Sequence, residues 1–315
     1  MSRRKGNKAN RSIIRAGIFA LLFLLCFHRS TYVLRYKMYE NDTVGSFYRE
    51  KRDSLDVVIV GTSHVYRGIS PMEIWDERGI ASYSLATGSQ SFSSSYYLIK
   101  DAIKTQHPKV IVLEVYGANY TGDYVSLARL HASTDGIPLN ATKLELFQEL
   151  LPRTLTFTES LEFIFPIIAY HSRWEELEEK DFHPMNTFLK GFLMDYDTAQ
   201  QSEPETTAET SRIYKGTKEY FDKIVDICKE NQVELILCQT PSSAGDDYSK
   251  EHRKVNTLIT YAKNQGISCV DLQAEDPTDY LMETVTDYAL NNRNFFLYHV
   301  YSDSVSADQQ IKKIF

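Results

Sequence analysis

The sequence of 315 residues predicts an α/β fold, in which helices cover both faces of a parallel sheet. Two observations lead to this prediction. Short continuous apolar runs, typical of strands buried on both faces, occur in both halves of the chain. They alternate with segments whose apolar residues recur at helical spacing. Alternating strands and helices form parallel sheets because each helix returns the chain to the edge at which the previous strand began.

The N-terminal segment is first basic and then apolar. Residues 1–11 contain no acidic residue, and residues 12–34 are mostly apolar. A helix needs about 20 apolar residues to cross a bilayer. We expect a signal-anchor transmembrane helix at 12–34, because residues 26–32 lack the small-x-small site at which a signal peptide would be cleaved. Basic residues favour the cytoplasmic side, so the arm 1–11 should be cytoplasmic and the main domain of this single-pass protein extracytoplasmic.

The remaining elements can be placed in chain order. Residues 35–54 are polar and charged and are predicted to be a linker before a domain at 55–315. Irregular spacing from about 117 to 210 indicates an inserted segment, largely helical, with a break at Pro166. The predicted strands are 56–60, 81–85, 110–115, 233–238 and 267–272, and the predicted helices between them are 92–106, 214–231 and 252–264.

Charge and cysteine content exclude several classes of function. Residues 1–15 hold six of the 35 basic residues, which leaves 29 against 42 acidic residues in the whole chain. A body this acidic is a poor nucleic-acid partner. Cysteine spacing matches no zinc or redox motif; buried free thiols are expected at Cys228, Cys238 and Cys269, with a Cys228–Cys238 disulfide as the alternative. We find no metal-ligand spacing and no phosphate loop, and expect no cofactor.

A serine follows the first predicted strand, in Gly61-Thr62-Ser63-His64. A serine at a tight turn between a strand and a helix is presented outward, where it can act as a nucleophile. The motif is not the Gly-x-Ser-x-Gly elbow, because position 65 is valine. The alternative is structural, since many such serines are helix N-caps.

Glycine and asparagine follow the next two strands. Gly88 comes after the second strand and Asn119 after the third. In a parallel sheet, ligands bind beyond the carboxyl ends of the strands. A backbone N–H and an asparagine amide at that edge are the donors that an oxyanion hole requires. Both are also common turn residues, which is the alternative explanation.

Several of these motifs together resemble a known family. Gly61-Thr-Ser-His64, Ser84-Leu-Ala-Thr-Gly-Ser-Gln90 and the strand 110–115 are similar to blocks of the SGNH/GDSL hydrolase-like proteins, and so are the segments 170–174 and 235–242. The resemblance covers about residues 50–275. Among these proteins the chain most resembles membrane-anchored bacterial envelope members, akin to lipoteichoic-acid D-alanylation and alginate O-acetylation proteins.

The resemblance implies a fold and a site. The fold would be a flavodoxin-like three-layer sandwich. Ser63 would be the nucleophile, with the amides of Ser63 and Gly88 as oxyanion donors. Asn119 would be a third donor if Gly117-Ala-Asn119 is the family's Gly-x-Asn block. Gln90 follows the second block and is a candidate substrate-binding residue.

The resemblance also implies partners. The substrate would be an envelope glycan or an acyl donor, and a membrane-bound O-acyltransferase would be a partner. His171 and Arg173, beside Trp174, are further candidates for binding a sugar or an anion. The alternative is that these two residues form a structural helix end.

The C-terminal part departs from the family's pattern. The family's base is a histidine preceded three residues earlier by aspartate, whereas His299 is preceded by Phe296. Either His299 works with a distant acid such as Asp287 or Asp279, or the base is lost, as a truncated or frameshifted C-terminus would explain. Two hypotheses follow: an anchored serine esterase or O-acyltransferase acting on an envelope polysaccharide, or a non-catalytic protein that binds glycan or scaffolds an acyltransferase.

Overall fold

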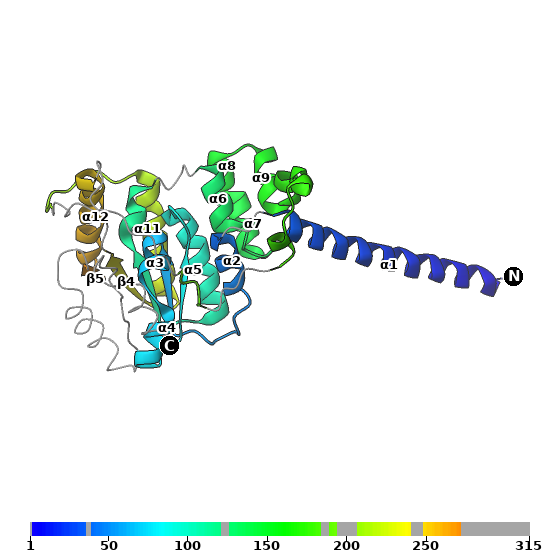
Figure 1. Cartoon of the computed structure of the whole chain (residues 1–315), viewed down its shortest axis with the longest axis horizontal. Helices are drawn as coiled ribbons and strands as arrows, with labels where there is room; N and C mark the ends of the chain where they lie inside the picture. Colours follow the sequence, from blue (N-terminus) through cyan, green and yellow to red (C-terminus); the bar gives the residue numbers. More distant parts are fainter. Residues whose placement is uncertain are drawn as a thin grey trace.

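The computed structural model contains one five-stranded parallel sheet (Figure 1). It describes residues 2–35, 39–120, 126–183, 189–193, 207–240 and 248–271. The strands follow the order β2-β1-β3-β4-β5, which is the order of flavodoxin-like doubly wound sheets. The predicted fold class is therefore confirmed. The strand bounds are β1 Val57–Gly61, β2 Ser82–Ala86, β3 Val110–Glu114, β4 Glu234–Gln239 and β5 Ser268–Asp271.

Helices cover both faces of the sheet, because successive side chains of a buried strand point to opposite sides. Val58 and Val60 of β1 face one core, and Val57 and Ile59 face the other. The result is a three-layer sandwich. The first core is covered by α5 (Phe92–Gln106), α11 (Lys215–Glu230) and α12 (Tyr248–Lys263), and the second by α3 (Ser63–Gly68) and α4 (Pro71–Arg78).

The segment expected to be a linker, 35–54, contains a packed helix. Helix α2 spans Tyr39–Phe47, and its Val44 and Phe47 are fully buried in the first core. The Tyr83 hydroxyl donates a hydrogen bond to the Thr43 carbonyl over 2.8 Å. The linker prediction is therefore wrong for α2. Two apolar residues in a short polar stretch gave too little periodicity to indicate a helix.

The described part of the predicted insertion is largely helical, with turns and coil at 189–193 and 207–210. It lies between η1 (Val115–Asn119) and α11, and its break falls at Pro166, as expected. Thr156 starts α9 with a capping box that includes Glu159. The elements are α6 Leu127–Thr134, α7 Ala141–Glu149, α8 Leu151–Thr154, α9 Phe157–Ile164, α10 Ile167–Tyr170, η2 His171–Glu175 and η3 Glu179–Phe182.

Helix α1 (Ser2–Leu34) projects away from the body (Figure 1). The segment Arg11–Leu34 has a mean hydropathy of 1.7, and 0% of its most apolar stretch is buried against the rest of the protein. By length and composition the helix can cross a membrane, although a signal sequence would have the same properties. The structure thus contains the helix that the sequence predicts, while its orientation in a membrane stays a prediction.

The cysteines are free thiols. Cys228 and Cys238 are buried, and Cys269 is half-buried. Burial raises the pKa of the Cys228 thiol to about 12 and that of Cys269 to about 11. The expected free thiols are confirmed, and the Cys228–Cys238 disulfide is not formed.

Candidate active site

The candidate residues of the first three strands meet at one edge of the sheet. Strand β1 pairs with β2 so that Gly61 lies opposite Ala86, and with β3 so that Val60 lies opposite Leu113. The segments that follow these strands carry Ser63, Gly88 and Asn119. The structure therefore brings these three predicted site residues to the same carboxyl edge, where ligands bind in open parallel sheets.

Ser63 is the first residue of α3, and it is half-buried. The N-cap of this helix is Thr62, whose hydroxyl accepts a hydrogen bond from the His64 N–H over 3.4 Å. The N-cap explanation for Ser63 is therefore wrong. Among the described residues, the Ser63 hydroxyl has no hydrogen-bond partner, so it is free to meet a ligand or a base.

A buried carboxylate holds the turn that carries Ser63. Glu114 Oε2 accepts hydrogen bonds from the Thr62 N–H (3.2 Å) and hydroxyl (2.9 Å), and Oε1 accepts one from the Tyr116 N–H (2.6 Å). Glu114 is 0% exposed. Gly61 makes room for it, since a Cβ there would lie 2.5 Å from Glu114 Cβ. The sequence analysis did not assign this role to Glu114. The feature that could have indicated it is a carboxylate at the end of an otherwise apolar strand.

Hydrogen bonds stabilise the turn that follows β2. The Thr87 N–H donates to the Gly61 carbonyl over 3.3 Å, and the Thr87 hydroxyl donates to Gln90 Oε1 over 2.9 Å. Gln90 Nε2 donates in turn to Ser95 Oγ over 3.0 Å, and Gln90 is 2% exposed. Both ends of the Gln90 amide are thus used to shape the turn that presents Gly88, and substrate binding by Gln90 stays a prediction.

Asn119 ends η1 with an unpaired amide. Neither its Oδ1 nor its Nδ2 has a hydrogen-bond partner among the described residues, although both atoms are buried. An unsatisfied buried polar group costs about 1–3 kcal/mol, so it calls for a functional explanation. Gly117 lets η1 approach the turn after β2, since a Cβ there would lie 3.1 Å from the Gln90 carbonyl oxygen. The amide is thus available as the predicted oxyanion donor.

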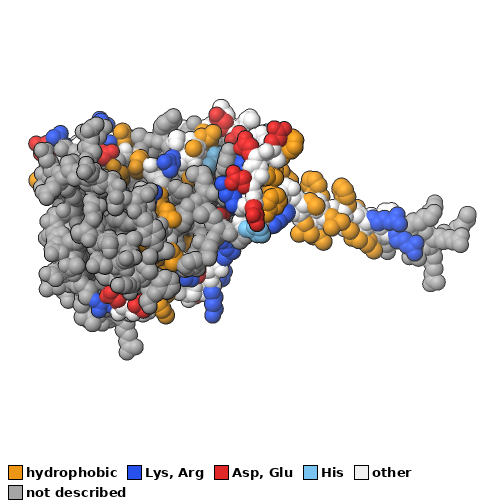
Figure 2. All heavy atoms as spheres, in the orientation of Figure 1, with side chains coloured by type: hydrophobic (Ala, Val, Ile, Leu, Met, Phe, Trp, Pro, Cys, Tyr) orange, Lys and Arg blue, Asp and Glu red, His pale blue; other side chains and the backbone are white. Residues whose placement is uncertain are grey.

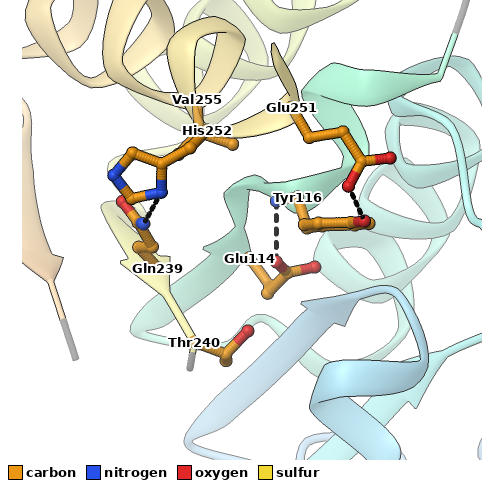
Figure 3. A pocket seen from close by; sticks show the side chains of 7 residues that line it. All are labelled: Glu114, Tyr116, Gln239, Thr240, Glu251, His252 and Val255. Atoms are coloured by element: carbon orange, nitrogen blue, oxygen red, sulfur yellow. Dashed lines mark hydrogen bonds between the residues drawn. The ribbon is translucent and has the colours of Figure 1, made fainter. Parts of the chain in front are cut away.

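A polar pocket opens at the ends of β3 and β4 (Figure 3). The Tyr116 hydroxyl donates a hydrogen bond to the Glu251 carboxylate at the start of α12. Gln239 Nε2 lies 3.3 Å from His252 Nδ1. Burial lowers the pKa of His252, so the ring is neutral at pH 7. The lining residues are Glu114, Tyr116, Gln239, Thr240, Glu251, His252 and Val255.

Sequence analysis missed this pocket because its residues come from separate segments. His252 lies on α12 and has no partner nearby in the sequence. Only the strand order, which places β4 beside β3, joins α12 to the end of β3.

The base stays a prediction. His299, Asp287 and Asp279 lie outside the described residues. The His64 ring packs edge-to-face on Tyr116, with centroids 4.5 Å apart, and its Nδ1 is 3.8 Å from Glu114 Oε1. The His64 ring thus lies against Tyr116 and close to the Glu114 carboxylate.

The two candidates in the insertion have structural roles. Arg173 is 6% exposed, and its Nη2 lies 3.1 Å from both carboxylate oxygens of Asp181. His171 Nδ1 lies 2.8 Å from the Ile168 carbonyl oxygen. The charge of Arg173 is thus already paired with Asp181, which favours the structural alternative, and ligand binding by Arg173 stays a prediction. The structural alternative also explains His171, whose ring closes the end of α10.

Comparisons with known proteins give weak similarities. No protein-family model matches the chain, and no curated protein sequence is significantly similar to it. A lipolytic protein assigned to the G-D-S-L family from Desulfitobacterium hafniense is 13% identical, with 76% of this chain and 90% of that chain covered and a TM-score of 0.32. A GDSL-like lipase from Bacteroides thetaiotaomicron is 10% identical, with 74% and 78% covered and a TM-score of 0.34. At such TM-scores the similarities carry no argument, and the flavodoxin-like fold is defined by the strand order itself.

Proposed function

We propose that this chain is a membrane-anchored serine esterase or O-acyltransferase of SGNH type, acting on acyl groups of an envelope polysaccharide. One observation carries the proposal: at one sheet edge, a serine hydroxyl lies on a braced turn and an asparagine amide follows the neighbouring strand, and neither has a hydrogen-bond partner among the described residues. Both groups are what acyl transfer needs, a nucleophile and an oxyanion donor.

The proposed chemistry has two steps. Ser63 Oγ attacks the acyl carbonyl while its proton passes to a histidine, for which His299 is the candidate. The negative charge on the carbonyl oxygen is stabilised by the N–H groups of Ser63 and Gly88 and by the Asn119 amide. The bond to the leaving alcohol then breaks, and the alcohol takes the proton. Water or a glycan hydroxyl attacks the acyl-serine and restores free Ser63.

The membrane setting rests on α1 and on the sequence resemblance. Helix α1 is long and apolar enough to anchor the body at a bilayer. The basic arm before it favours a body outside the cytoplasm. An envelope polysaccharide and a membrane-bound O-acyltransferase are therefore the substrate and the partner that we propose.

The altered C-terminal motif favours a second candidate function. Because no Asp-x-x-His follows residue 240, a protein that binds glycan or scaffolds an acyltransferase without catalysis is the alternative. In that case Ser63 and Asn119 would contact the glycan, and Ser63 would form no acyl intermediate.

Ester cleavage tests the proposal. The full chain in detergent is given p-nitrophenyl acetate and an O-acetylated polysaccharide, and released p-nitrophenol and acetate are measured. Ser63→Ala should abolish release, while Ser172→Ala, at an exposed serine of the insertion, should not change it. Release that persists in a folded Ser63→Ala variant would contradict the proposed nucleophile. Glycan binding without any cleavage by the wild type would support the alternative.

A further inference from the structure

Four large apolar side chains are exposed on or beside the segments that pack against α1. Phe165, Ile168, Trp174 and Phe182 are between 41% and 65% exposed. We call these four side chains the apolar collar. They lie between the end of α9 and the end of η3, and α10, η2 and η3 all contact α1. Large apolar side chains gathered at one place on a surface indicate an interaction site.

The collar is continuous with α1. The Phe27 ring of α1 meets the Phe165 ring edge-to-face, with centroids 6.5 Å apart. The Arg29 guanidinium donates to the Phe182 carbonyl over 3.2 Å. Figure 2 shows the orange side chains of α1 reaching the body where the two meet. The apolar surface of the helix therefore passes directly onto the collar.

Buried polar contacts fix the angle between α1 and the body. The Arg173 guanidinium, paired with Asp181, donates to the Leu34 carbonyl at the end of α1 over 2.6 Å. Arg35 donates to the Asp135 carbonyl over 3.1 Å and lies 3.3 Å from Asp42. Because these contacts occupy the end of α1, the helix is held against the insertion and is not joined to it by a free linker.

We propose that the apolar collar lies in the interfacial layer of the bilayer that α1 crosses. The inference rests on the proposed membrane anchoring, since a helix that crosses the bilayer brings the residues packed on its outer end to the lipid surface. Tryptophan and phenylalanine are well suited to that layer; Trp in particular is enriched there. The occupant is lipid because the collar continues the surface of α1 that the bilayer itself would cover.

Charge beside the collar indicates that its lipid contact is apolar. Glu175 and Glu176 follow Trp174 directly and are exposed. The two carboxylates gain nothing from an anionic leaflet, and of the exposed cations beside the collar Arg29 donates to the Phe182 carbonyl and Lys180 is paired with Glu178, so electrostatic attraction contributes little to holding the collar in place. The contact should therefore be insensitive to salt. Its consequence is a body held at a fixed height, with the Ser63 edge at a constant distance from the membrane.

Tryptophan fluorescence tests this placement, because the chain contains only two tryptophans. Trp75 on α4 is 56% exposed and Trp174 is 65% exposed, so each serves as the control for the other. The full chain is reconstituted into phosphatidylcholine vesicles as Trp75→Phe or Trp174→Phe. In the vesicles the fluorescence emission of Trp174 should be blue-shifted. Lipids brominated near the headgroup should quench this emission at low and high salt alike, and the emission of Trp75 should stay unchanged.

The outcomes separate the collar from the anchoring. Vesicle flotation after an alkaline carbonate wash reports whether α1 is inserted. A chain that floats with Trp174 unquenched would overturn the collar while the anchoring stands. Protection of Trp174 from aqueous acrylamide without quenching by brominated lipid would indicate contact with a second copy of the chain and would also overturn it. A chain that does not float would contradict the anchoring, and with it the inference.

Discussion

Replacing Glu114 with glutamine should loosen the turn that carries Ser63. Glu114 offers two oxygens to three donors: the N–H and hydroxyl of Thr62, and the N–H of Tyr116. Glutamine has one oxygen, so in either orientation at least one backbone N–H loses its acceptor. A buried donor without a partner costs about 1–3 kcal/mol. For a domain of this size that corresponds to a melting temperature lower by roughly 2–12 °C.

Thermal unfolding of the full chain in detergent measures this change. The matched control is Glu219→Gln, which removes a charge from a pair with Arg153 that is exposed and 3.0 Å long. Such a surface pair contributes about 0–1 kcal/mol. Equal melting temperatures for Glu114→Gln and the wild type would refute the assigned role of Glu114 as the brace of the Ser63 turn.

Three further predictions concern other positions. Arg173→Met should lower the free energy of unfolding by about 3–5 kcal/mol by removing the cation paired with the buried Asp181 carboxylate; adding Asp181→Leu should restore most of it, and denaturant titration of both variants would show a failure to recover. Asn119→Ala should reduce kcat for ester cleavage by roughly 10²–10³-fold without lowering the melting temperature, since its amide has no hydrogen-bond partner to lose among the described residues; unchanged kinetics would remove it from the oxyanion hole. Burial lowers the pKa of His252 below its ordinary 6.5, so the unfolded state takes up a proton first and stability falls as pH drops below 6.5. His252→Gln should show a smaller loss between about pH 7.5 and about pH 5.5, and an identical loss would contradict this assignment.

The sheet could be predicted because its strands are buried on both faces. A run such as 57–60 has no polar residue and is followed by Gly61, which favours a strand buried on both faces; the predicted bounds 56–60 differ by one residue from the observed Val57–Gly61. Parallel pairing then determines which edge collects the residues that follow each strand. For this reason Ser63, Gly88 and Asn119 were placed together from the sequence alone, and the structure puts all three segments at one edge.

The remaining site residues depend on packing that the sequence does not display. Gln90 and Arg173 have side chains that commonly bind ligands. In the fold both are buried, and both form hydrogen bonds or ion pairs with other side chains of the protein. Nothing in the sequence around Glu114 indicates a special role. Its role arises only because Gly61 leaves room for the Glu114 side chain beside the turn. Short helices such as α2 carry few apolar residues, so their burial depends on the partners that the fold provides.

Labelling by a serine-directed fluorophosphonate tests the central claim most directly. The intact mass of the full chain is measured before and after the probe, with the Ser63→Ala and Ser172→Ala variants alongside. The account predicts a single adduct on the wild type and on Ser172→Ala, and none on Ser63→Ala. A folded wild-type chain that forms no adduct would contradict an activated nucleophile at Ser63.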